Sequence, residues 1–227
     1  MVSYGLIRRP FNHVYDLTGG GYALDGDANH LSFYHNLQDD LAAAGKPVAM
    51  LFIAYSLTPS QNYPTPIREG LEALKYILEE KHRSPSEIIL GGDSAGGAIA
   101  LAIVSHFSHP SPDLPHMRLD GKLKAVVIMA PWVSFRTDWQ SNKRNEFKDF
   151  INSIISNEWV ALYKGDKPTN YYMEAAEAPA SWWEGNMVEQ LLCTVGGDEI
   201  LLDSISQWAG RYKVKPITFV CENATES

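Results

Sequence analysis

The chain has 227 residues, of which 45% are hydrophobic, so it can bury the core of one sizeable domain. Its net charge of −8 at pH 7 argues against nucleic acid or an anionic membrane surface as the main partner. The composition favours a small, neutral or modestly charged molecule as the partner.

The first half of the chain alternates strand-length apolar segments with helical segments. A strand is expected at 12–17 and an amphipathic helix at 29–44, with Leu31 on its apolar face. A second strand is expected at 47–55 and a second amphipathic helix at 66–82. This alternation is typical of a parallel sheet flanked by helices.

The middle of the chain continues the alternation around a glycine-rich turn. A short buried strand is expected at 87–90, a helix at 95–107 and another strand at 122–130. The helix is apolar nearly all round, so it is expected to lie inside the protein.

In the last third of the chain the alternation of strands and helices is first interrupted and then resumes. Residues 136–183 mix charges and aromatics around helix-like patches such as 147–162, and we interpret them as a lid-like insertion. Strands are then expected at 191–195 and 217–221, joined by a helix at 200–213. The whole chain is expected to form a single domain.

The sequence Gly-Asp-Ser-Ala-Gly at 92–96 fits the pattern Gly-x-Ser-x-Gly between an expected strand and an expected helix. A serine on such a sharp turn has a strained backbone, and glycine neighbours remove side chains that would clash there. The N–H groups that begin the following helix point toward a developing oxyanion. We therefore expect Ser94 to be a nucleophile. The alternative is an ordinary glycine-rich turn.

A second glycine-rich loop, Thr-Gly-Gly-Gly at 18–21, follows the first expected strand. Such a loop brings bare backbone N–H groups close to a substrate carbonyl oxygen and, with the N–H of Ala95, would complete an oxyanion hole. One alternative is a flexible turn. A phosphate-binding loop fits less well, because neither Gly-x-Gly-x-x-Gly nor a closing Lys-Ser/Thr is present.

An acidic pair, Asp198 and Glu199, closes the penultimate strand. An acid at the carboxyl edge of a sheet can orient an imidazole and stabilise the imidazolium formed during acyl transfer. Asp198 follows Ser94 in the order that suits this role, although it could instead cap the next helix. Glu199 and Asp203 are interpreted as helix-surface charges.

Three histidines, His106, His109 and His116, are close together in the sequence. They follow the far end of the helix that begins after Ser94. We therefore favour solvated loop histidines over a catalytic base or a metal cluster.

Together the motifs resemble the hormone-sensitive-lipase group of α/β-hydrolases, and most closely its fungal branch with the steryl acetyl hydrolases. The matching stretches are Thr-Gly-Gly-Gly-Tyr at 18–22, Tyr-Ser-Leu-Thr-Pro at 55–59, Ile-Leu-Gly-Gly-Asp-Ser-Ala-Gly-Gly at 89–97, Ala-Pro-Trp-Val-Ser at 130–134 and Gly-Asp-Glu-Ile-Leu-Leu-Asp at 197–203. The resemblance implies an α/β-hydrolase fold over residues 1–227, with a mostly parallel sheet, flanking helices and a partial lid.

The resemblance also implies the chemistry. It indicates an ester-cleaving enzyme with Ser94 as nucleophile, Asp198 as triad acid, and Gly20, Gly21 and Ala95 as oxyanion donors. It implies no cofactor and no metal, and its substrate would be a small hydrophobic ester.

The chain departs from the family pattern at three points. Thr18 stands where the family's oxyanion loop opens with histidine, and this change is expected to impair the positioning of that loop. No histidine follows Asp198, although the triad histidine is expected close to residues 221–224. The family's first strands and its C-terminal helix have no counterpart, so we expect a chain that is incomplete at both ends and has an exposed sheet edge.

We expect a carboxylic-ester hydrolase, either a short-acyl esterase or a deacetylase acting on a hydrophobic alcohol, that is impaired by the missing histidine. Loss of a triad member leaves an enhancement over water of roughly 10³–10⁴. Two alternatives stay open: a catalytically inactive binding protein with the hydrolase fold, and a tailoring enzyme of a fungal biosynthetic pathway.

Seven aromatic residues in or near the expected lid either line an apolar pocket or pack in the core, which is the commoner use of such residues. They are Trp132, Trp139, Trp159, Tyr171, Tyr172, Trp182 and Trp183.

Two cysteines, Cys193 and Cys221, are too few for a disulfide framework and lack the spacing of metal ligands. Both lie in apolar runs, which favours buried free thiols and a reducing compartment. The sequence has neither a signal-peptide stretch nor the ~18 consecutive apolar residues that span a bilayer. A cytoplasmic protein is therefore expected, unless an N-terminal anchor is missing.

Overall fold

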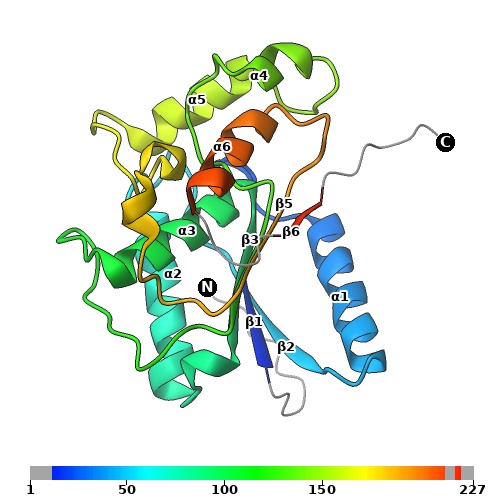
Figure 1. Cartoon of the computed structure of the whole chain (residues 1–227), viewed down its shortest axis with the longest axis vertical. Helices are drawn as coiled ribbons and strands as arrows, with labels where there is room; N and C mark the ends of the chain where they lie inside the picture. The colour runs from blue at the N-terminus through cyan, green and yellow to red at the C-terminus, as the bar shows by residue number, and fades with distance from the viewer. Residues whose placement is uncertain (1–11, 213–217, 221–227) are drawn as a thin grey trace.

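The computed structural model describes residues 12–212 and 218–220, which form a six-stranded sheet with helices on both faces (Figure 1). All neighbouring strands are parallel, in the order β2-β1-β3-β4-β5-β6. The strands are β1 (Asn12–Leu17), β2 (Val48–Ile53), β3 (Ile88–Asp93), β4 (Ala125–Met129), β5 (Leu191–Thr194) and β6 (Thr218–Val220). The α-helices are α1 (Ala28–Ala43), α2 (Thr65–Lys75), α3 (Ser94–Ser108), α4 (Gln140–Arg144), α5 (Ser153–Lys164) and α6 (Leu202–Tyr212).

The expected parallel sheet is confirmed, and each strand lies close to its predicted range. The helix expected at 66–82 is divided, because α2 ends at Lys75 and continues as a π-helical turn over Tyr76–Glu80. Short 3₁₀ turns cover Pro85–Glu87, Ala175–Glu177 and Ala180–Trp183. Within the described residues, β2 ends the strand order and pairs with β1 alone.

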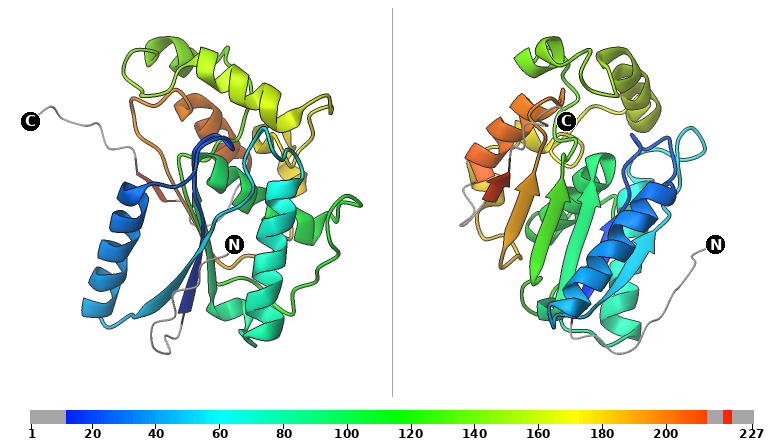
Figure 2. Two further views of the ribbon diagram at one scale, coloured as in Figure 1. Left: turned by 180° about the vertical axis from the view of Figure 1, so that it is seen from behind. Right: turned by 90° about the vertical axis from the view of Figure 1, so that its right-hand side faces the viewer.

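Helix α3 is buried along most of its length, as its sequence predicted. Every residue from 95 to 106 is buried, because the sheet covers one side of α3 and α2 packs on the other. Figures 1 and 2 show α1 on the opposite face of the sheet from α2 and α3. Only Tyr34 of α1 is buried, and Leu31, which was expected on its inner face, is 57% exposed.

The prediction of solvated loop histidines was wrong for His106 and for His109. His106 lies inside α3, and its ring nitrogens contact the carbonyl of Pro115 and the N–H of Ser111. His109 stacks on the ring of Trp182. Among the residues that the structure describes, no group of three or more His, Cys, Asp or Glu side chains could hold a metal ion.

Within the segment 136–183, α4 and α5 lie beyond the carboxyl ends of the strands and form the top of the molecule (Figures 1 and 2). The two 3₁₀ turns near its end, Ala175–Glu177 and Ala180–Trp183, pack against α6 instead. The helical patch expected at 147–162 begins later, at Ser153, where the side chain of Asn152 caps α5. Phe147 lies before this helix and is 95% exposed. A lid function for the segment stays a prediction.

Cys193 is a buried free thiol, as expected, and burial raises its pKa to about 12. Cys221 lies outside the described residues. No helix in the described ranges combines the length and the apolar character that crossing a membrane requires.

Candidate active site

Ser94 lies where β3 passes into α3, at the carboxyl edge of the sheet. Its φ of 48° falls in the left-handed region, which is strained for a residue with a side chain. A Cβ on Gly92 would come 2.6 Å from the carbonyl carbon of Gly96, and a Cβ on Gly96 would overlap the carbonyl oxygen of Leu17. The turn therefore requires glycine on both sides of the serine, as the motif indicated.

The 18–21 loop lies directly beside this turn. The N–H of Gly19 donates to Oδ1 of Asp93 at 2.8 Å, and a Cβ on Gly19 would overlap the same carboxylate. Gly20 and Gly21 have φ values of 109° and 60°, and a Cβ on Gly21 would overlap the ring of Trp159. The loop is thus held between the nucleophile turn and α5, which is not what a freely flexible turn would show.

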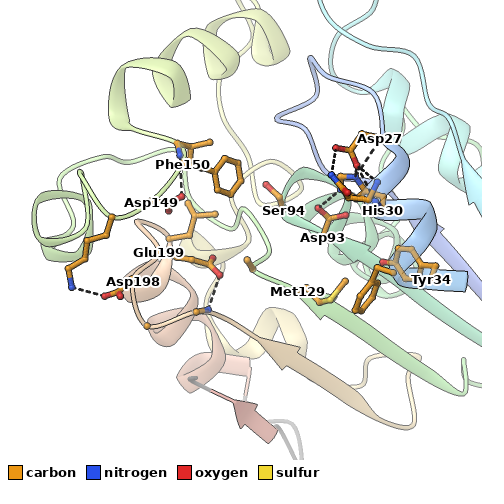
Figure 3. A pocket seen from close by; sticks show the side chains of 18 residues that line it. Asp27, His30, Tyr34, Asp93, Ser94, Met129, Asp149, Phe150, Asp198 and Glu199 are labelled. Atoms are coloured by element: carbon orange, nitrogen blue, oxygen red, sulfur yellow. Dashed lines mark hydrogen bonds and ion pairs between the residues drawn. The ribbon is translucent and has the colours of Figure 1, made fainter. Parts of the chain in front are cut away.

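A cavity of ≈ 890 Å³ opens at this edge of the sheet, and both Ser94 and Asp198 line it (Figure 3). The backbone positions predicted as oxyanion donors, Gly20, Gly21 and Ala95, are not among its lining residues, so their role stays a prediction. None of the seven aromatic residues lines it either. Trp132 and Trp183 are buried in the core, in agreement with the packing alternative.

One side of the cavity is formed by the start of α1, and we call residues 27–34 the α1 wall. Asp27 caps α1, and its Oδ1 lies 3.0 Å from Nδ1 of His30. Nε2 of His30 lies 3.5 Å from Oδ2 of Asp93. Burial alone would lower the pKa of His30, but the hydrogen bond to Asp27 and the charge of Asp93 outweigh burial and raise it.

A buried carboxyl group stands behind the α1 wall. The hydroxyl of Tyr34, which lines the cavity, donates to Oδ1 of Asp16 at 2.6 Å, and Asp16 is 1% exposed. Burial raises the pKa of Asp16 to about 7, although the hydrogen bond from Tyr34 opposes the shift. Sequence reasoning missed this residue; the available signal was a single acid between Tyr15 and Leu17 in the expected strand.

The opposite side of the cavity, which we call the α4–α5 wall, consists of residues 148–151 and 196–199. Nζ of Lys148 lies 2.7 Å from Oδ1 of Asp198, and both side chains are about half exposed. Asp198 does not cap the following helix, because α6 begins only at Leu202. Figure 3 shows Ser94 between the two walls.

The interpretation as a helix-surface charge was wrong for Glu199, whereas Asp203 lies in the first turn of α6 with a side chain that is 30% exposed. Glu199 lines the cavity, its Oε1 accepts the N–H of Gly196 at 2.8 Å, and burial raises its pKa. Oδ2 of Asp203 accepts the N–H of Ser141 at 2.7 Å, which ties α6 to α4. Both acids satisfy backbone donors that would otherwise be left without a partner.

All seven histidines of the sequence lie within the described residues, and His30 is the one that lines the cavity. The ionic partner given by the structure for Asp198 is Lys148, not a histidine. Residues 221–224, near which the triad histidine was expected, lie outside the described residues. Sequence reasoning missed both His30 and Lys148.

Comparison with known proteins agrees with this geometry. A family model described as alpha/beta hydrolase fold matches residues 14–221. An acetyl-hydrolase of Streptomyces hygroscopicus is 25% identical over 89% of this chain and 63% of its own length. An esterase of Gibberella moniliformis is 31% identical over 57% of this chain and 38% of its own length.

Among solved structures, an esterase from the bacterial hormone-sensitive lipase family has a TM-score of 0.73 and 27% identity, over 95% of this chain and 67% of that one. The chain spans less than two thirds of the length of the two curated relatives above. Because these relatives come from a bacterium and a fungus, the fungal branch is not singled out.

Proposed function

Because the chain belongs to the α/β-hydrolase fold family, we propose that it cleaves carboxylic esters through an acyl-enzyme formed on Ser94. One observation carries the proposal: a strained strand-to-helix turn holds Ser94 in the same cavity as Asp198, beside a glycine-rich loop. Neither a metal nor a cofactor enters the proposed reaction.

The proposed reaction has two halves. The Oγ of Ser94 attacks the ester carbonyl, and the N–H groups of Gly20, Gly21 and Ala95 stabilise the oxyanion. The proton released by Ser94 passes to the departing alcohol, and water then cleaves the acyl-enzyme, which releases the acid and restores the hydroxyl of Ser94. Asp198 is proposed as the triad acid, the residue that orients and stabilises the imidazolium in Ser-His-Asp hydrolases.

We propose a short-acyl or acetyl ester of a hydrophobic alcohol as the substrate. Phe33, Met129 and Phe150 give the cavity an apolar lining, which suits such an alcohol. The cavity is also lined by five carboxylates against one lysine and one histidine, which disfavours an anionic substrate. The Streptomyces relative, an acetyl-hydrolase, is consistent with a short acyl group. The buried thiol of Cys193 supports a reducing, cytoplasmic location.

The expected rate depends on which group accepts the proton of Ser94. The sequence has no histidine after Asp198, so a polypeptide of these 227 residues should retain only the enhancement due to binding and the oxyanion hole. That enhancement is roughly 10³–10⁴ over water. Acylation should therefore be detectable but slow.

The test is acylation itself. The chain is incubated separately with p-nitrophenyl acetate and with a fluorophosphonate, which reacts covalently with hydrolase serines. Adducts are detected by intact-mass spectrometry. We expect one adduct on Ser94, a burst of p-nitrophenol, and neither in Ser94→Ala. No adduct together with saturable binding of an apolar ligand would instead favour the binding-protein alternative, for which the pairing of Asp198 with Lys148 is the supporting observation.

A further inference from the structure

The carboxylate of Asp93 connects three parts of the site. Its Oδ1 accepts the N–H of Gly19 at 2.8 Å, and its Oδ2 lies 3.5 Å from Nε2 of His30. Asp93 also immediately precedes Ser94, so its backbone belongs to the strained turn. We propose that Asp93 and His30 are positioning residues that hold the 18–21 loop in the register an oxyanion requires. This inference rests on the proposed function, because it concerns the same oxyanion.

The fit between Asp93 and the loop is close. A Cβ on Gly19 would overlap Oδ2 of Asp93, so the loop backbone lies directly against the carboxylate. The side chain of Asp93 is 22% exposed, so water competes only partly for its two oxygens. A hydrogen bond from a backbone N–H to a carboxylate is charge-assisted and stronger than a neutral one. The contact therefore fixes the loop relative to Ser94.

The ring of His30 faces the second oxygen of Asp93 and can donate to it in either charge state. Its Nδ1 lies 3.0 Å from Oδ1 of Asp27 and 3.3 Å from the N–H of Asp27. When Nδ1 is unprotonated it can accept that N–H, which leaves the proton on Nε2, facing Asp93. When His30 is charged, both nitrogens donate to carboxylates. In the charged form and in this neutral tautomer Nε2–H faces Asp93, and the charged form binds more strongly.

Three acids act on His30: Asp27 at the start of its own helix, Asp93 from β3 and Asp16 from β1. Because the pKa of His30 is raised, its charged form persists to a higher pH than that of a free histidine. The pairing with Asp93 should weaken as the pH rises through that pKa. Thr18, which stands where the family has histidine, makes such external support of the loop more important.

The first test measures the rate of phosphonylation of Ser94, because the phosphonyl oxygen occupies the oxyanion position. We expect His30→Ala to slow this rate roughly tenfold, and Asp93→Ala up to a hundredfold, because displacing an oxyanion donor slows the reaction by such factors. His30→Gln retains a side-chain N–H donor and should recover part of the rate. The matched control is His35→Ala, on the same helix with a 70% exposed side chain, which should react like the unchanged chain.

The second test does not require reactivity. Amide hydrogen exchange of the peptide covering residues 17–24 is compared in the unchanged chain, His30→Ala and His35→Ala, at pH values below and above the pKa of His30. Protection of this peptide should fall severalfold in His30→Ala only. In the unchanged chain it should fall toward that level at the higher pH. A general loss of packing would lower protection in distant peptides such as those of α6 as well.

The outcomes separate this inference from the proposed function. If the unchanged chain does not react with the fluorophosphonate but loop protection falls selectively in His30→Ala, the positioning role is supported and the proposed function fails. If the chain reacts but His30→Ala leaves both the rate and the loop protection unchanged, the positioning role is overturned and the proposed function survives.

Discussion

The two walls of the cavity both carry charged groups but use them in different ways. On the α1 wall, the polar groups contact one another and the backbone, and they lead inward to Asp16, which is 1% exposed. On the α4–α5 wall, Lys148 and Asp198 form an ion pair between side chains that are 53% and 49% exposed. Exposed pairs of this kind typically contribute only about 0–1 kcal/mol.

This difference indicates that the α1 wall fixes the geometry of the site, whereas the α4–α5 wall controls access to the cavity. A buried, hydrogen-bonded acid resists movement, because moving it would leave a charged or polar group without a partner. An exposed ion pair can open and exchange with water at little cost in free energy. We therefore expect changes in the α1 wall to alter stability and reactivity, and changes in the α4–α5 wall to alter mainly which molecules enter.

The largest effect should come from Asp16. Its folded pKa of about 7 lies above the unfolded value near 4, so the folded state binds the proton more tightly and stability falls as the pH rises from about 4 to about 7. A shift of about three units corresponds to roughly 4 kcal/mol over that window. Asp16→Asn keeps an acceptor for Tyr34 and should flatten the profile in urea unfolding at pH 4.5 and pH 8. Asp39→Asn, an exposed acid on α1, is the control, and equal profiles in the two variants would contradict the burial argument.

Gly19→Ala should produce the next largest effect. The added methyl group would overlap the Asp93 carboxylate and push the 18–21 loop away from Ser94. We expect phosphonylation to slow about a hundredfold, and the melting temperature to fall, since overpacking typically costs about 1–3 kcal/mol. Gly210→Ala is the matched control, because a Cβ there meets nothing within 4 Å in α6. It should leave the rate unchanged and stabilise the helix by about 0.5–1 kcal/mol.

Lys148→Ala should have a smaller effect that appears only when imidazole is supplied. Removing Lys148 frees Oδ1 of Asp198, so an imidazole from solution can bind there and accept the serine proton. We expect added imidazole to accelerate p-nitrophenol release severalfold more in this variant than in the unchanged chain, with stability altered by less than about 1 kcal/mol. Lys124→Ala, which removes the exposed pair with Glu189, should show no such gain. Equal acceleration in both variants would argue against a role for Asp198.

The smallest effect should distinguish two exposed phenylalanines, one in the α4–α5 wall and one next to it. Phe147 and Phe150 are 95% and 96% exposed, but only Phe150 lines the cavity. Both Phe147→Ser and Phe150→Ser should change stability by less than about 0.5 kcal/mol. Only Phe150→Ser should raise the KM, by a few-fold, for p-nitrophenyl esters of longer acyl chains. A matching rise in Phe147→Ser would mean that the substrate contacts surface outside the cavity.

The local sequence predicted most of the fold. The strand expected at 12–17 matches the bounds of β1, and the uniformly apolar character of α3 predicted its burial. The glycines around Ser94 predicted a strained turn, because only residues without a side chain fit where Gly96 meets Leu17. Periodicity failed for α1, because Leu31 is exposed. Amphipathic spacing identifies an apolar face of a helix but does not show whether another part of the protein packs against that face.

What only the tertiary structure decided is the set of contacts around the cavity. The sequence by itself determined that Ser94 would stand on a strained turn next to a glycine-rich loop, because turn geometry depends on a few consecutive residues. It did not reveal that His30 contacts Asp93, that Tyr34 contacts Asp16 or that Lys148 contacts Asp198. These pairs join distant parts of the chain through the packing of the parallel sheet, and no short-range pattern records which side chains meet at its carboxyl edge.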